Sequence, residues 1–262
     1  VWIDALTNYI TGIGYDPDGS SPQFEQFWPA DVHIIGKDII RFHTIYWPIM
    51  LMALDLPLPK QVFGHPWLLF SQEKMSKSRG NVIYADDLCR HFGVDGVRYY
   101  LLKEMPFGSD GSITYETVIA RYNSDLANTL GNLVNRTVAM TNKYFGDKVS
   151  RPAAGDELDA QLTGLAESTV GEYRKLMEGF RVADALEAIL NLARRANKYI
   201  DETAPWALAK DEANKEKLEG VLYRLLEVIR YLGALLQPFM PDTAEKIFAQ
   251  IGSQTKTLDS LN

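Results

Sequence analysis

The sequence has few of the residues that cross-link a chain or anchor it in a membrane. Cys89 is the only cysteine among 262 residues, so the chain can form no internal disulfide and no cysteine-based zinc site. A single thiol fits a reducing compartment, and we expect a cytoplasmic protein. Its most apolar stretch, residues 44–56, is interrupted by Pro48 and Asp55 and is too short to span a bilayer. We therefore expect no membrane partner.

An excess of positive charge is lacking as well. The chain carries 34 acidic residues against 27 lysines and arginines, a formal net charge of -7. Proteins that hold nucleic acid by bulk electrostatics are basic, so nucleic-acid binding here would need a local patch and specific polar contacts. Hydrophobic residues make up 46% of the chain, enough for a buried core in one or two domains.

The chain changes character near residue 113. Before this point, short β-rich apolar runs alternate with helical patterns and with turns that contain Gly or Pro. Such alternation predicts an α/β fold with part of a parallel sheet over residues 1–112. The predicted strands are 32–36, 61–65 and 67–70, and the predicted helices are 37–54, 84–93 and 94–105, with Gly93 as a helix stop.

From residue 113 to residue 262 the patterns are almost entirely helical. Apolar residues recur at helical spacing in 114–145, and further amphipathic stretches follow. A last helix is expected to begin at Asp242, with Glu245 completing a capping box. Long helices joined by short loops predict a helical bundle. The other predicted bundle helices are 156–178, 182–203 and 212–236.

Residues 71–80, SQEKMSKSRG, place Lys74 and Lys77 among serines and a glycine. Lysine is a compact charge that suits a phosphate, and positioned cations stabilise the charge that develops when a nucleotidyl group leaves ATP. A loop of this kind can close over a triphosphate and later release the product. On composition alone, a solvated surface loop with two lysines explains the same residues.

KMSKS resembles the second signature of the class I aminoacyl-tRNA synthetases. Together, the matching segments extend from residue 1 to about residue 251 and resemble the methionyl-tRNA synthetase family. The resemblance implies the second half of a Rossmann-like catalytic domain, followed by an α-helical anticodon-binding domain. It also implies ATP-dependent activation of methionine, with Mg²⁺, and transfer of methionine to the 3′ end of tRNA(Met). The segments are VWIDALTNYI, DVHIIGKDIIRFHTIYWP, KMSKSRGNVI, SDLANTLGNLVNR, APWALAK and MPDTAEKI.

The resemblance also assigns roles to residues of the first domain. It implies that Lys77 contacts ATP and that Lys74 is the supporting cation. Gly36 and Asp38 are expected to help position the nucleotide, because a helix follows them. Aromatic rings pack well against a thioether, although an aromatic core stripe and a structural histidine explain the same residues. The residues implied to line the methionine pocket are Trp2, Ala5, Tyr9, Ile39 and His43.

A second candidate surface lies on the first bundle helix. The residues Asn128, Asn132, Asn135 and Arg136 fall at i, i+4, i+7 and i+8, so three amides and a guanidinium share a face. Such groups read base edges, and Trp206 after Pro205 can stack on an unpaired base. An amide-lined helix contact with a buried tryptophan is the alternative. The resemblance implies that the CAU anticodon is read by Asn128, Asn132, Arg136 and Trp206.

The chain departs from the family in two respects. The first class I signature, a His-Ile-Gly-His type element, is absent, and so is the connective region that carries zinc in some members. The chain begins at Val1 in mid-pattern without a methionine. We therefore expect a fragment whose partner is the missing N-terminal half of the same enzyme, and no zinc ligands in these residues.

Two other interpretations stay open at this point. The chain could be a non-catalytic tRNA-binding module, made of the bundle and a vestigial half-sheet. It could also belong to another class I synthetase, specific for leucine, valine or cysteine. Cysteine is disfavoured because no zinc thiolates are available to select it, and leucine and valine are disfavoured by the pairing of NLVNR with APW.

Overall fold

The computed structural model describes residues 3–70, 73–75, 82–105, 108–146 and 148–261. It forms two compact units, Val1–Leu68 with Phe107–Gly111 and Leu69–Pro106 with Ser112–Asn262. A three-stranded sheet has the order β4-β3-β5 and is made of β3 (Leu68–Phe70), β4 (Glu73–Lys74) and β5 (Gly111–Ile113). A domain boundary between residues 112 and 113 stays a prediction. Among the described helices, none combines the length and the apolar character that crossing a membrane requires.

The first unit contains the predicted parallel pairing. Strands β1 (His33–Gly36) and β2 (Val62–His65) run parallel, with His33 opposite Val62 and Gly36 opposite His65. Parallel neighbours need a crossover connection, and the chain between them supplies it. Three short helices precede this pair, namely α1 (Ile3–Leu6), α2 (Asn8–Thr11) and α3 (Pro22–Phe27).

The crossover differs from the single helix predicted over 37–54. It begins with a 3₁₀ turn, Lys37–Ile39, widens into a π-helical turn, Phe42–Tyr46, and ends as α4 (Trp47–Ala53). Pro48 lies in the first turn of α4, where a missing backbone N–H is tolerated. The crossover contributes Trp47 and Leu51 to the unit's core. The buried members of that core are Leu6, Ile10, Phe24, Trp28, Trp47 and Leu51.

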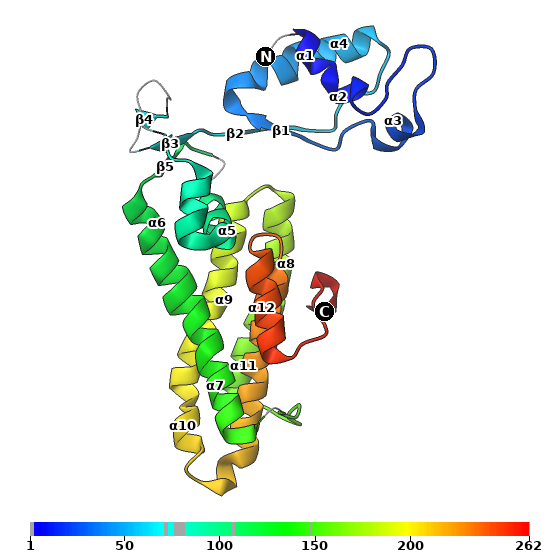
Figure 1. Ribbon diagram of the computed structural model, residues 1–262. Coiled ribbons are helices and arrows are strands. Elements are labelled where there is room, and N and C mark those ends of the chain that lie inside the picture. The colour runs from blue at the N-terminus through cyan, green and yellow to red at the C-terminus, as the bar shows by residue number, and fades with distance from the viewer. Residues whose placement is uncertain (1–2, 71–72, 76–81, 106–107, 147, 262) are drawn as a thin grey trace. The chain divides into compact units, whose positions relative to one another are not determined.

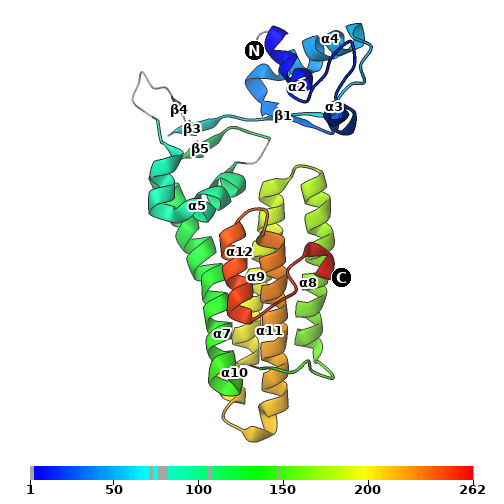
Figure 2. The ribbon, with the colours of Figure 1, turned by 45° about the vertical axis from the view of Figure 1, so that its right-hand side comes forward.

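The second unit carries α5 (Ala85–Glu104) and then the helical bundle (Figure 1). The predicted break at Gly93 is confirmed, because this residue takes φ 72° and ψ 160° inside α5. The bundle helices run alongside one another in both views (Figure 2). Its further elements are α6 (Tyr115–Arg121), a π-helix (Tyr122–Gly131), α7 (Asn132–Phe145), α8 (Glu157–Glu178), α9 (Val182–Thr203), α10 (Pro205–Leu208), α11 (Lys215–Leu236) and α12 (Pro241–Ile251). The predicted fold class, α/β followed by all-α, is confirmed.

The start of α12 differs from its prediction. This helix begins at Pro241, whose missing N–H is harmless at a first position, and Asp242 does not cap it. The acceptor comes instead from α5, where Asp95 accepts a hydrogen bond of 2.6 Å from the backbone N–H of Thr243. A tertiary contact therefore replaces the local capping box.

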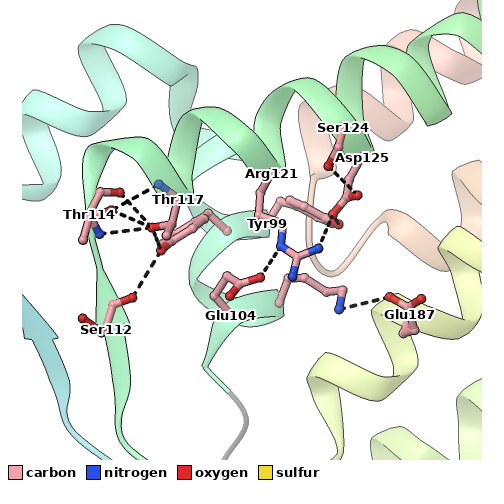
Figure 3. A network of polar contacts seen from close by, with 11 residues as sticks. Tyr99, Glu104, Ser112, Thr114, Thr117, Arg121, Ser124, Asp125 and Glu187 are labelled. Carbon is pink, nitrogen blue, oxygen red and sulfur yellow. Dashed lines mark hydrogen bonds and ion pairs between the residues drawn. The ribbon is translucent and has the colours of Figure 1, made fainter. Parts of the chain in front are cut away.

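A polar network fixes α5 against the helix that follows β5 (Figure 3). The hydroxyl of Tyr99 donates to the buried Asp125 at 2.8 Å, and burial together with this bond raises the pKa of Tyr99. Arg121 pairs with Glu104 and lies 3.7 Å from Asp125. Because a buried carboxylate needs such partners, the network holds the first bundle helix against α5.

We predict that Gly93→Ala lowers the free energy of unfolding by about 1–3 kcal/mol. The dihedral angles of Gly93 lie in a region that is essentially restricted to glycine, and a Cβ there meets no neighbour, so backbone strain is the cause. Gly171→Ala is the matched control in the exposed interior of α8, where alanine should add about 0.5–1 kcal/mol. Urea denaturation of both variants checks the opposite signs, and equal effects would contradict the prediction.

Candidate functional site

The first candidate site is built around Tyr9 and His43. The Nδ1 of His43 lies 3.0 Å from the carbonyl oxygen of Ile39, which can only accept, so the neutral ring carries its proton there. Its Nε2 is then the acceptor for the Tyr9 hydroxyl at 2.8 Å. His43 is buried, whereas the Tyr9 side chain is 36% exposed. Three of the predicted pocket residues are thus brought together, with the tyrosine ring open to solvent.

His33 belongs to the same cluster, although sequence reasoning did not single it out. The indole N–H of Trp47 donates to Nε2 of His33 at 3.2 Å, so this nitrogen carries no proton. Burial lowers the pKa of His33, and the neighbouring His43 lowers it further. The His33 ring lies 4.4 Å from the ring of Tyr9. The ring of a neutral histidine therefore packs against the ring of Tyr9, a contact that only the tertiary structure reveals.

The hydroxyl of Tyr9 is protonated at neutral pH, as an ordinary phenol is, and burial raises its pKa further. Because Nε2 of His43 is the acceptor, the hydroxyl is the donor of this bond. Ala5 is exposed on α1, the helix that packs against the π-helical turn carrying His43. The residues on this face offer an aromatic ring, a hydroxyl already engaged and a buried imidazole, which suits an apolar or thioether group.

Gly36 and Asp38 lie where β1 ends. A Cβ at residue 36 would come within 2.6 Å of the Asp38 carboxylate, so glycine leaves room for that side chain over the strand end. Ligands of open α/β sheets bind at the carboxyl ends of the strands. Between the two residues, Lys37 pairs with Asp110 at 2.5 Å, and this bond is the first cause that lowers the pKa of Asp110. The ion pair anchors the turn that follows β1 to Asp110. Asp38, in the same turn, is exposed.

The side chains of three predicted residues lie outside the described part of the structure. Trp2 and Lys77 lie outside the described residues, and for Lys74 only the backbone is described, in β4. Within the described part of the chain, no three His, Cys, Asp or Glu side chains lie close enough together to hold a metal ion.

The second candidate site lies on the π-helix and α7. Asn128 and Asn132 are exposed on this helix. The guanidinium of Arg136 pairs with Asp201 of α9 at 2.8 Å and lies 6.0 Å from the centre of the Trp206 ring. Together these side chains offer amide, guanidinium and aromatic groups at one place on the bundle.

Trp206 is 45% exposed, so the alternative of a buried tryptophan is wrong. The local chain explains its position. Ala204 ends α9 at a positive φ of 43°, and Pro205 then starts α10 at once, so the next side chain turns outward. The half-exposed indole beside a guanidinium is typical of a stacking platform for a planar base.

Asn135, which the spacing placed on the same face, is exposed on α7. At about 100° per residue, it lies closer around the helix to Asn128 than to Arg136. It also lines a cavity of about 690 Å³ between the π-helix, α5 and α12, together with Tyr122, Asp95 and Lys246.

Comparison with known proteins covers nearly the whole chain. Residues 1–138 match the family model for class I (M) tRNA synthetases, and residues 150–260 match the anticodon binding domain of methionyl tRNA ligase. The methionine–tRNA ligases of Clostridium perfringens and Bacillus subtilis are 55% and 56% identical over 100% and 98% of this chain, and over 40% and 39% of their own length. The chain therefore spans about two fifths of the curated relatives it matches.

A solved structure gives the same result. Mycobacterium tuberculosis methionyl-tRNA synthetase in complex with methionyl-adenylate is 42% identical to this chain, with a TM-score of 0.95. The match covers 100% of this chain and 52% of that chain. The free form of the same M. tuberculosis protein matches 95% of this chain with a TM-score of 0.85.

We predict that His33 makes the protein less stable in mild acid. Because its folded pKa is lowered from 6.5, its contribution is complete above that pH and is lost as the pH falls toward the folded pKa. Between about pH 7 and about pH 5, the free energy of unfolding should fall more in the parent than in His33→Gln, whose amide oxygen can still accept from Trp47. Urea titrations at both pH values measure this, and identical pH dependence would refute it.

Proposed function

This chain belongs to the class I (M) tRNA synthetases, and from that premise we propose that its parent protein is a methionine–tRNA ligase. The reaction begins when the methionine carboxylate attacks the α-phosphorus of ATP, which forms methionyl-adenylate and releases pyrophosphate. The terminal hydroxyl of tRNA(Met) then attacks the activated carbonyl and releases AMP. Both nucleophiles are competent without a strong general base, so the main tasks of the protein are orientation and charge stabilisation.

The observation that carries this proposal is the Tyr9–His43 pair. A half-exposed phenol, held by a buried imidazole that is itself held by the Ile39 carbonyl, forms a rigid aromatic wall. We propose that the methionine thioether packs on this wall, with Trp2 and Ala5 completing the pocket. The relative from M. tuberculosis was solved with methionyl-adenylate, which supports a methionine site on this fold.

For the nucleotide we propose Lys77 as the residue that stabilises the transition state, with Lys74 in support. Gly36 and Asp38 would border the adenylate from the end of β1. Mg²⁺ would enter with ATP on the phosphate oxygens, the ligands that this hard cation prefers. We assign no protein ligand to it.

A further part of the same enzyme is the proposed partner of the first unit. Ile45, Ile49 and Met52 are exposed at i, i+4 and i+7 along the crossover, and Ile34 is exposed on β1. Apolar residues on one helix face and on a sheet normally pack against other elements. Together with the relatives' greater length, this supports a catalytic domain completed by an N-terminal half. We propose that this enzyme works in the cytoplasm.

For the second unit we propose that Asn128, Asn132, Arg136 and Trp206 read the CAU anticodon of tRNA(Met). Amides and a guanidinium can bond to base edges, and an indole can stack on an unpaired base. Recognition of this kind works in a protein whose net charge is -7, because it depends on local contacts.

We predict that Lys77→Ala lowers methionine-dependent pyrophosphate exchange by several orders of magnitude in the full-length enzyme. Loss of a cation that stabilises the leaving phosphates removes several kcal/mol of transition-state stabilisation. Binding of tRNA should change little. Lys60→Ala is the matched control, because Lys60 lies on the surface, paired with Asp31. Exchange rates equal to the parent's in the Lys77 variant would remove this residue from the mechanism.

We predict that Trp206→Ala weakens binding of a CAU anticodon hairpin by about fivefold to a hundredfold, because a base–indole stack is worth about 1–3 kcal/mol. Trp206→Phe should retain most of the affinity, since phenylalanine still offers a ring face. Fluorescence titration with the labelled hairpin measures both. An alanine variant that binds as tightly as the parent would exclude the indole from the interface.

A further inference from the structure

The continuous helix over residues 122–145, called the reading helix below, carries Asn128, Asn132 and Arg136 and changes its winding among them. It is π-helical over Tyr122–Gly131 and α-helical from Asn132. At the junction the N–H of Asn132 donates to the carbonyls of Ala127 and Thr129. Asn128 and Asn132 therefore lie on either side of an irregular turn centred on Thr129. Their mutual orientation depends on how this turn is held, and π-helical turns in other proteins frequently mark functional sites.

Asn197 of α9 holds this turn. Its side-chain nitrogen donates to the carbonyl of Thr129 at 3.0 Å and to that of Ala193, one turn earlier in α9, at 3.1 Å. Carbonyl oxygens only accept, so the amide nitrogen has to face the turn. The Thr129 carbonyl therefore accepts from the side chain of Asn197 and also from the backbone N–H of Asn132.

The oxygen of the same amide group lowers the stability of the fold. This oxygen, Oδ1, is buried without a hydrogen-bond partner among the residues that the structure describes. A buried acceptor that has lost water and gained no donor lowers stability. A leucine has the same branching and the same number of side-chain heavy atoms, and it leaves no polar atom unpaired. Stability alone therefore does not account for asparagine at this position.

One turn further along α9, Asp201 holds Arg136 at 2.8 Å. Asn197 and Asp201 are at i and i+4, so they share a face of α9. This face contacts the reading helix at Thr129 and again at Arg136, seven residues apart. Trp206 follows the end of the same helix by three residues. Helix α9 therefore contacts the turn next to Asn128, pairs with Arg136, and ends three residues before Trp206.

We propose that Asn197 is a positioning residue for anticodon reading, which sets the turn at Thr129 so that Asn128 and Asn132 meet the bases together with Arg136 and Trp206. This inference rests on the proposed function of the second unit. Asn197 acts through the backbone of the reading helix and does not touch the RNA. Its loss therefore weakens the choice between anticodons more than it weakens RNA binding as a whole.

The test compares Asn197→Leu and Asn197→Asp with the parent in the full-length enzyme. Leucine removes the donor and the unpaired oxygen, and aspartate keeps the shape but turns a carboxylate toward two carbonyls. The probes are a CAU anticodon hairpin and the same hairpin with a GAU anticodon. Thermal unfolding and methionine-dependent pyrophosphate exchange are measured on every variant to count folded active sites. Asn191→Leu is the matched control, since Asn191 is exposed on α9 and contacts Arg194 of its own helix.

We expect Asn197→Leu to unfold at the parent's temperature or above it. The ratio of the two hairpin dissociation constants should nevertheless fall by about tenfold, the weight of one lost hydrogen bond that orients others. Asn197→Asp should lose the same discrimination at a lower unfolding temperature, and Asn191→Leu should match the parent in both respects.

A purely structural residue would instead lower the unfolding temperature or weaken both hairpins equally. Either result with Asn197→Leu, or an unchanged ratio in both Asn197 variants, overturns the inference. A parent enzyme that does not distinguish the two hairpins would refute the proposed anticodon reading itself. A discriminating parent with equally discriminating variants would refute only the role of Asn197.

Discussion

Burial of α9 is the constraint on which the second unit depends. Ten of its residues, from Ala185 to Ile200, are buried, and the helix packs against α5, α8, α11 and the π-helix. A helix enclosed in this way must satisfy each polar side chain through its neighbours, because little water reaches it. The amide nitrogen of Asn197 meets that requirement by donating to Thr129 of the reading helix, although its oxygen does not, and the exposed Asp201 at the end of α9 pairs with Arg136. The packing of α9 thus also bears on the geometry of the candidate RNA surface.

A buried polar group also connects α5 with the first bundle helix. Asp125 is 5% exposed, and its carboxylate is compensated by the hydroxyls of Tyr99 and Ser124 and by Arg121. These partners come from α5 and from the helix that follows β5, so one buried charge connects the chain before β5 with the chain after it. A buried ionised group tolerates few alternative arrangements, which makes such a network specific even where its net contribution to stability is small.

In the first unit, His33 and His43 lie in one aromatic cluster but have different hydrogen-bond partners. His33 is kept neutral by burial and by an indole donor, whereas His43 is oriented by the Ile39 carbonyl so that it accepts from Tyr9. Ile39 ends the 3₁₀ turn of the crossover and His43 lies in the π-helical turn that follows, so the bond between them joins the two irregular parts of the crossover.

The sequence by itself determined the family, the fold class and the strands of the parallel pair, because motif letters, apolar spacing and glycine positions are local properties. It also identified Tyr9, His43, Asn128, Asn132, Arg136 and Trp206 as candidates. Only the tertiary structure decided that Asp95 and not Asp242 serves the start of α12, that His33 supports Tyr9, and that Asn197 holds Thr129. Each of these contacts joins residues that are 24 to 148 positions apart, and no local pattern encodes a partner at such a separation.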